Sequence, residues 1–350
     1  MTVGYYGSKG TNLIGIVDIN LLAPEQARGL QCAQNTNYIG QPTPLTTVQC
    51  QPNGYAFRNS GNVALNPQGN STTVDALILD QIRPYRGYRA INIIQPRFNS
   101  NYHSLQVSGQ HRFTGASQVN LAYTFSKNLT DSQTDRSSSP QNPYDIRGDY
   151  GRAALDRRHI FTLSYVYELP FYRSQNGFIG KVLGGWEASG IVTYNTGLPF
   201  TVSSAGFDPA GIGFLGPSAT GPRPNIICNP NENAPNTQQQ FFNTSCFQAP
   251  PLVQAFSTPA ASVVPLSSDI GSAGRGVING PSTTRVDFTM MKNIRFGESM
   301  RLQLRAEAFN VFNKTNFRFL DLNVTSTGFG AVVAPTRDPR VIQLAAKFYF

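Results

Sequence analysis

Apolar and polar side chains alternate along residues 340–350, and this segment ends on Phe-Tyr-Phe. One face carries Ile342, Leu344, Ala346, Phe348 and Phe350. Because successive side chains of a strand point to opposite faces, the segment predicts a β-strand with one apolar surface. A soluble β-sandwich also alternates, but a closing strand with an aromatic end is more typical of an outer-membrane β-barrel.

The same period of two occurs in seven further segments upstream. They are residues 1–17, 103–113, 119–126, 161–169, 186–195, 285–290 and 301–308. The pattern therefore predicts an all-β chain with about eight antiparallel strands, each with one apolar and one polar face. Lys292 falls on the apolar side as an exception, which a bulge or a side chain that snorkels to the interface would explain.

The lengths of the connections favour a transmembrane barrel over a sandwich. Counting back from the final strand, the short connections are 114–117, 170–184 and 295–299, and the long ones are 20–99, 128–156, 198–281 and 315–339. All long connections fall at the same end, as in bacterial barrels with short periplasmic turns and long extracellular loops. Because the loops hold more residues than the strands, we interpret the strands as an arc of a larger barrel wall.

Composition agrees with a membrane β-protein. Only 13% of the residues are charged, Gly, Phe and Tyr are plentiful, and no run of about 18 apolar residues could form a transmembrane helix. The start of the sequence resembles no export signal, so we expect a fragment of a longer protein. The net charge of +9 is dispersed, which argues against nucleic-acid binding, and the mixed charges within 145–159 predict a solvated loop base.

Four cysteines form two pairs with the same interval, Cys32 with Cys50 and Cys228 with Cys246. Four cysteines allow three pairings, but the shared interval favours one disulfide within each long loop. Disulfides indicate a compartment outside the cytoplasm.

The polar faces of two late strands carry a row of mixed charges. Its members are Arg285, Asp287, Arg301, Arg305 and Glu307. We expect a cross-strand charge network in a wet barrel lumen, and the sharper hypothesis is that these groups hold a plug or line a solute path. The terminal Phe348, Tyr349 and Phe350 predict either a simple lipid-facing strand end or, in addition, a signal for the barrel-assembly machinery.

Motifs for catalysis or cofactors are weak. Residues 211–216 match GxGxxG, but prolines at 209 and 217 do not suit the strand and helix that this fingerprint requires. His103, His111 and His159 lack the spacing of a metal site, and no nucleophile elbow occurs. We therefore expect no cofactor, no metal and no enzymatic activity.

Several stretches resemble the carboxy-terminal part of TonB-dependent outer-membrane receptors, in the OmpA-related subgroup with a carboxypeptidase-regulatory-like domain upstream. They include YTFSKNLTDSQTD (123–135), QNPYDIRGDYGRAALDRRHIFTLSYVYELPF (141–171), GGWEASGIVTYNTGLPFTV (184–202) and RLQLRAEAFNVFNKTNFRF (301–319). NSNYHSLQVSGQHRF (99–113) and YYGSKGTNL (5–13) match the same region.

This resemblance implies that residues 1–350 are the last part of a 22-stranded barrel, with the signal peptide, regulatory-like domain and plug upstream. It implies import of a scarce solute (a siderophore, oligosaccharide or peptide) across a Gram-negative outer membrane. The implied partners are outer-membrane lipid and lipopolysaccharide, the assembly machinery, and TonB through the upstream part. Two alternatives remain: a barrel for adhesion or surface organisation, and a secreted soluble β-domain that binds carbohydrate.

Overall fold

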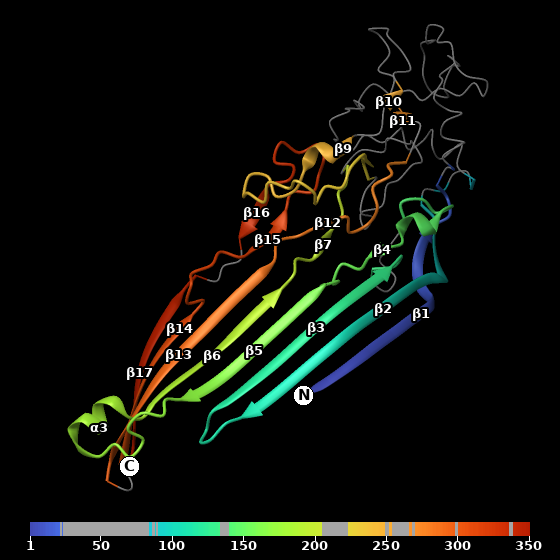
Figure 1. Cartoon of the computed structure of the whole chain (residues 1–350). Helices are drawn as coiled ribbons and strands as arrows, with labels where there is room; N and C mark the ends of the chain where they lie inside the picture. Colours follow the sequence, from blue (N-terminus) through green and yellow to red (C-terminus); the bar gives the residue numbers. More distant parts are fainter. Residues whose placement is uncertain are drawn as a thin grey trace, which may run out of the picture.

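One antiparallel sheet dominates the computed structural model (Figure 1), which describes residues 1–21, 23, 84–85, 88, 90–133, 140–204, 223–248, 252–253, 266–267, 270–297, 300–335 and 339–350. Its main path runs through β1 (Thr2–Asp18), β2 (Asn92–Arg112), β3 (Gln118–Thr130), β5 (His159–Glu168), β6 (Trp186–Asn195), β13 (Thr283–Phe296), β14 (Met300–Phe309) and β17 (Val341–Tyr349). The short β4 (Gly151–Arg152) pairs with the end of β3. The prediction of an all-β, antiparallel chain is confirmed.

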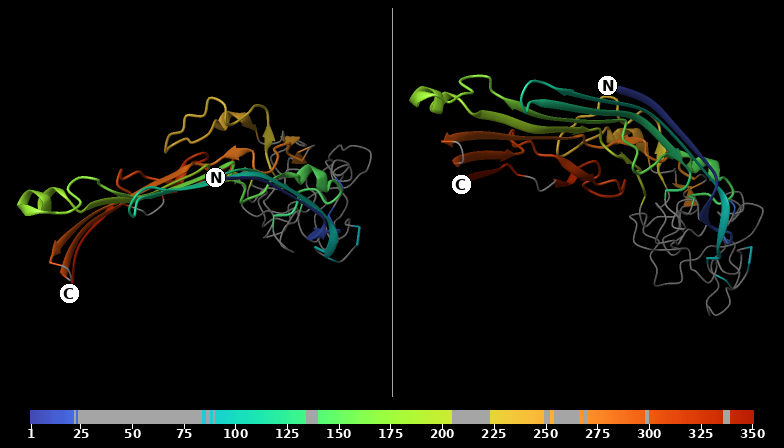
Figure 2. Two further views of the ribbon diagram at one scale, coloured as in Figure 1. Left: turned by 60° about the horizontal axis from the view of Figure 1, so that its bottom comes forward. Right: turned by 90° about the horizontal axis from the view of Figure 1, so that it is seen from below.

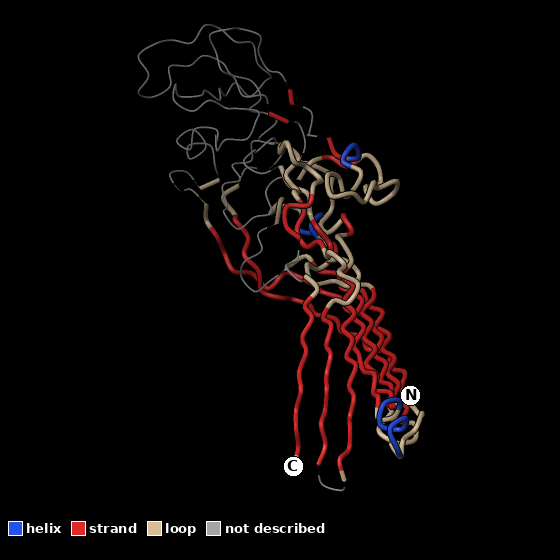
Figure 3. Tube along the Cα trace, turned by 90° about the vertical axis from the view of Figure 1, so that its left-hand side faces the viewer, coloured by secondary structure: helices blue, strands red, loops and turns tan. Residues whose placement is uncertain are grey.

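Each long strand pairs with the next long strand along the chain, so the sheet is a simple meander. Figure 2 and Figure 3 show that it is curved and twisted rather than flat. Within the described residues β1 and β17 are not paired with each other, and the sheet is therefore an open arc.

The strand registers align the apolar positions into one continuous face. A row across the sheet illustrates this, because Trp186 of β6 pairs with Lys292 of β13, which pairs with Leu304 of β14, which pairs with Ala346 of β17. The opposite face carries polar side chains, as the period of two predicts. Many large apolar side chains of the apolar face, such as Leu344 and Phe348, are exposed.

The short connections gather at one end of the sheet. Residues 113–117 close a hairpin with a hydrogen bond from Phe113 N to Ser117 O (2.9 Å), and Gly115 adopts φ +79°. Gly297 (φ +72°) lies between β13 and β14. The connection between β5 and β6 contains α3 (Gly177–Leu183), a helix that the sequence pattern does not predict. No helix in the described ranges is long and apolar enough to cross a membrane.

The long connections all leave the opposite end of the sheet, as predicted (Figure 1). Their described parts contain the 3₁₀ helices η1 (Ile146–Asp149) and η2 (Thr244–Cys246). They also contain short strand pairs: β7 (Pro199–Phe200) with β12 (Ile278–Asn279), β8 (Asn225–Ile226) with β9 (Phe247–Gln248), β10 (Leu252–Val253) with β11 (Leu266–Ser267), and β15 (Phe317–Leu320) with β16 (Val332–Pro335). We call the described parts of these connections the loop cap.

The largest cluster of buried apolar side chains lies in the loop cap rather than on the sheet. Its members are Val202, Phe242, Cys246, Phe247, Ala273, Ile278 and Leu320. The rings of Phe242, Phe247 and Phe329 meet edge to face, with centroids 5.3–5.9 Å apart. Two connections, 196–282 and 310–340, therefore share one core above the end of the sheet.

A second, smaller cluster forms where β1 and β2 bend. The register shifts between Gly10 and Leu13, where Asn12 adopts φ +56°, and such a bulge increases the local bend of a strand. Beyond it, the buried ring of Phe98 lies against Gly15, where a Cβ atom would stand 2.2 Å from the ring. Because β2 begins at Asn92, the predicted connection 20–99 is too long: its last eight residues belong to the strand.

Candidate functional site

The charged segment 145–159, predicted to form a solvated loop base, is buried at the carboxylates of Asp149 and Asp156, whereas Asp145 and Arg147 are exposed. Asp149, at the end of η1, is 1% exposed, and it forms ion pairs with Arg223 and, at 3.3 Å, with Arg275. Its carboxylate also accepts a hydrogen bond from Gln141 N (2.7 Å). The prediction is wrong for Asp149, because residues 74 and 126 positions later fold back onto its carboxylate, which the local sequence does not indicate.

Gln141 closes the same network from the other side. Its side-chain oxygen accepts from Arg223 N (2.8 Å), and its side-chain nitrogen donates to Gly271 O (3.1 Å). Burial lowers the pKa of the Arg223 guanidinium, while the attraction of Asp149 opposes this shift. The network fixes the connection after β3 to two points of the connection after β6.

A second buried carboxylate, Asp156, organises the base of the cap. It receives Arg152 Nε at 2.7 Å and Arg158 Nε at 3.7 Å, and it accepts a hydrogen bond from Asn128 N (2.8 Å). Arg152 also donates through Nη1 to the side chain of Asn279 (2.6 Å). Asp156 thus orients two guanidinium groups at the end of the sheet.

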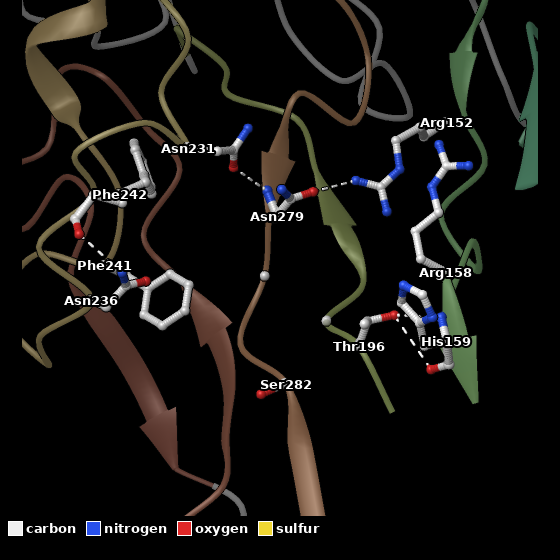
Figure 4. Close-up of a pocket in the computed structure, with 13 residues that line it drawn as sticks. Arg152, Arg158, His159, Thr196, Asn231, Asn236, Phe241, Phe242, Asn279 and Ser282 are labelled. Carbon is white, nitrogen blue, oxygen red and sulfur yellow. Dashed lines mark hydrogen bonds between the residues drawn. The ribbon is translucent and has the colours of Figure 1, made fainter. Parts of the chain in front are cut away.

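These two arginines line a cavity of about 430 Å³ between the sheet and the loop cap (Figure 4). The lining residues are Arg152, Arg158, His159, Thr196, Gly197, Asn231, Ala234, Asn236, Phe241, Phe242, Asn279, Gly280 and Ser282. Several of their side chains can donate or accept hydrogen bonds, and two phenyl rings add apolar surface. Small-molecule sites have volumes in this range and combine apolar surface with a few placed polar groups.

Sequence reasoning singled out Arg152, Arg158 and His159 only as a charged cluster, and it missed the rest of the cavity. Asn231, Asn236 and Phe241 lie in the Asn-rich stretch between Cys228 and Cys246. That composition was the only available signal. It indicates a loop and says nothing about which strand the loop folds against.

The predicted disulfide between Cys228 and Cys246 is present, with Cα atoms 4.9 Å apart. It braces the end of β8 against η2, next to the pairing of Ile226 with Phe247. Cys246 is fully buried in the core of the cap. Cys32, Cys50 and the GxGxxG match at 211–216 lie outside the described residues.

The five residues of the predicted charge row share the polar face, but their ion pairs run along the strands rather than across them. Arg285 pairs with Asp287 (2.9 Å) within β13, and Arg305 pairs with Glu307 (3.4 Å) within β14. The register explains this correction, since Glu307 lies opposite Thr289 rather than opposite Asp287.

Arg301, the fifth residue of that row, stacks instead on an aromatic ring. Its guanidinium lies 4.2 Å from the ring centroid of Tyr349, and Lys347 Nζ lies 4.8 Å from the same centroid. Tyr349 therefore belongs to the polar face. Phe348 and Phe350 point to the apolar face, with ring centroids 6.3 Å apart.

The three histidines lie on the apolar face and contact aromatic side chains. His103 Nδ1 is 2.6 Å from Tyr5 Oη, and His159 Nδ1 is 2.8 Å from Tyr123 Oη. The ring of His111 meets Phe113 edge to face, with centroids 4.4 Å apart.

The alternating faces, the one-sided connections and the loop cap describe the wall of a membrane barrel, and comparison with known families agrees. Residues 1–343 match the model of the outer membrane beta barrel domain family. The chain belongs to this family. A search of curated proteins found no match. The protein is located in the outer membrane of a Gram-negative bacterium, which removes the soluble alternative.

Family membership also orients the barrel wall. The apolar face is the lipid face, the polar face is the lumen side, the hairpin end is periplasmic, and the loop cap is extracellular. The charge row and Tyr349 then lie on the lumen side, whereas the cavity lies at the outer rim.

Proposed function

We propose that this chain is the carboxy-terminal wall and loop cap of a TonB-dependent receptor that imports a scarce solute across the outer membrane. The resemblance of residues 123–135, 141–171, 184–202 and 301–319 to such receptors supports this function. The open arc also fits a larger barrel, because an unpaired strand edge is unfavourable in lipid. The remaining strands and a plug would come from sequence beyond this chain, and we propose no enzymatic role.

The observation that carries the proposal is the cavity at the outer rim. Loops on a rigid frame usually carry recognition, and here the frame and the cap each contribute side chains. Arg152 and Arg158 extend from the sheet side, and Asn231, Asn236 and Phe241 extend from the cap (Figure 4). A solute held there by hydrogen bonds would lie at the entrance to the lumen.

Uptake in living cells tests this function. Cells that carry the full-length protein receive three labelled probes in turn: a ferric hydroxamate siderophore, a maltodextrin and a short-peptide mixture. We expect one probe to accumulate only when TonB is present, and accumulation to stop when a protonophore removes the inner-membrane gradient. Entry of all three probes that is independent of TonB would instead indicate a passive barrel for adhesion or surface organisation.

The cavity itself is tested with the probe that the uptake assay identifies. Asn279→Ala removes an amide that both faces the cavity and orients Arg152. Loss of one or two hydrogen bonds predicts binding weaker by about fivefold to tenfold. The matched control is Asn142→Ala, in the same cap but outside the cavity lining. Equal binding by both variants would place solute recognition elsewhere.

A further inference from the structure

The periplasmic connection between β5 and β6 is attached to the end of β13 by hydrogen bonds. Gln175 is buried; its side-chain nitrogen donates to Asn293 O (2.8 Å), and its side-chain oxygen accepts from Arg295 N (3.1 Å). Asn293 N donates to Gly185 O (2.8 Å). These hydrogen bonds hold α3 beside the end of β13.

Lys292 and Trp186 complete this attachment from the lipid face. The ammonium group of Lys292 donates to Val182 O (2.9 Å) and to Gly184 O, and the indole of Trp186 donates to Val182 O (3.1 Å). These carbonyls belong to the last turn of α3 and its cap, where cations are favoured. The predicted exception on the lipid face thus fastens α3 to the edge of that face.

Although it is held in place, α3 leaves its apolar side chains uncovered. Phe178 is 83% exposed and Ile179 is 62% exposed, and Val182 and Leu183 are about half exposed. Phe171 and Tyr172, just before the helix, are also exposed. An apolar patch beside a membrane-spanning wall is expected to insert into the boundary between headgroups and acyl chains.

This patch is continuous with a groove on the lipid face. Trp186 follows α3 directly and lines a groove of about 490 Å³ together with the apolar side chains of Met290, Leu304, Ala306, Leu344 and Ala346, and with the charged Lys292 and Arg305. The two alanines lie among larger neighbours of β13, β14 and β17, and their small side chains leave room between those neighbours. The apolar part of this groove suits an acyl chain, and its two charged lining residues are both cationic.

The charge beside the groove is positive. Residues 170–186 contain Arg173 and Lys181 and no acidic residue. Lys181 is exposed in the last turn of α3, with Nζ 5.7 Å from the ring centroid of Phe296. A phosphate group at the headgroup level is the complementary partner, because basic residues at a membrane surface attract anionic lipid.

We propose that α3 and the groove at Trp186 form a binding site for an anionic phospholipid of the inner leaflet. One acyl chain occupies the groove, and the headgroup phosphate contacts Lys181. This site is separate from solute import, and its failure would leave the proposed function untouched.

Fluorescence from Trp186, the only tryptophan among these 350 residues, reports on the site. The full-length protein is reconstituted in phosphatidylethanolamine vesicles that contain a minor share of phosphatidylglycerol, with bromine on the acyl chains of one lipid at a time. Subtraction of a Trp186→Phe variant isolates the signal. From the quenching of Trp186 by each brominated lipid we obtain the local share of that lipid. We expect the share of phosphatidylglycerol near Trp186 to be about fivefold higher than its share in the bulk membrane.

Two variants separate specific binding from general contact with lipid. Lys181→Glu should abolish the enrichment, and Lys181→Gln should reduce it. Arg147→Glu, the same charge reversal at an exposed residue of the loop cap, should retain it. Heat-modifiable migration of each variant confirms a folded barrel. Quenching in proportion to the bulk lipid composition, or enrichment that persists in Lys181→Glu, would overturn the proposal.

Discussion

Asp149 and Arg275 form a buried ion pair at 3.3 Å although 126 positions separate them in the chain. Both side chains are at most 3% exposed, and Arg223 contacts the other carboxylate oxygen of Asp149. The pair joins two extracellular connections that leave different strands. The loop cap is therefore one folded unit with its own polar lock in addition to its apolar core.

Asp149→Asn should loosen the cap. The change leaves the buried Arg223 guanidinium without its carboxylate partner, which typically costs about 3–5 kcal/mol. The expected result is faster cleavage of the cap by trypsin added to intact cells. Asp145→Asn is the matched control, since Asp145 is exposed and its main contact is an N-cap hydrogen bond to Gly148 N (3.3 Å). Cleavage at the same rate in both variants would show that the lock contributes little.

Removal of the Cys228–Cys246 disulfide should destabilise the same unit by a different route. Closing a loop of this size restricts the unfolded chain, and its loss typically costs about 2–4 kcal/mol. We expect Cys228→Ser with Cys246→Ser to lower the midpoint temperature at which the cap becomes sensitive to protease. Ser245→Ala, in η2 beside the bridge, serves as the control. An unchanged midpoint in the double variant would contradict a structural role for the bridge.

Phe350→Asp should impair assembly of the full-length barrel. Phe350 is 97% exposed at the periplasmic rim, where a charged side chain costs only about 0–1 kcal/mol in a folded barrel. A large loss of heat-modifiable barrel would therefore reflect failed recognition by the assembly machinery rather than instability. Leu155→Asp, which also replaces an exposed apolar side chain by a carboxylate but in the loop cap, should assemble normally. Normal yield of Phe350→Asp would exclude an assembly signal at this residue.

Lys292→Met should free the periplasmic helix without unfolding the wall. Val182 O keeps the indole of Trp186 as a donor, but Gly184 O loses the ammonium group. Loss of these charge-assisted bonds predicts a cost of about 1–3 kcal/mol, seen as faster hydrogen exchange within 177–185. Lys127→Met, an exposed lysine of the lipid face near the other rim, should leave that exchange unchanged. Equal exchange in both variants would assign the position of α3 to the hydrogen bonds of Gln175, Trp186 and Asn293.

The strands and their faces could be predicted because each depends on local periodicity. Alternation in 301–308 and 340–350 was enough to place Leu304 and Ala346 on one face, and the registers of β14 and β17 confirm that assignment. That the long connections leave one end of the sheet and the short connections the other likewise followed from their lengths alone. α3 could not be predicted, because its seven residues, two of which are glycines, give no clear helical period.

The contacts of the charged residues were beyond sequence reasoning. Arg285 and Arg305 were expected to pair across strands, but the register places each beside a carboxylate of its own strand. Lys292 was recognised as an exception, yet its acceptors lie in a connection more than 100 positions earlier.

The sequence by itself determined a β-meander with one apolar face, because side-chain direction in a strand depends only on the alternation of neighbouring residues. The tertiary structure alone decided that Asp149 meets Arg275, that Arg152 meets Asn279 above a cavity, and that Lys292 holds α3. Those contacts depend on how long connections fold back over the sheet. The amino-acid composition of a loop does not specify which distant residues it will contact.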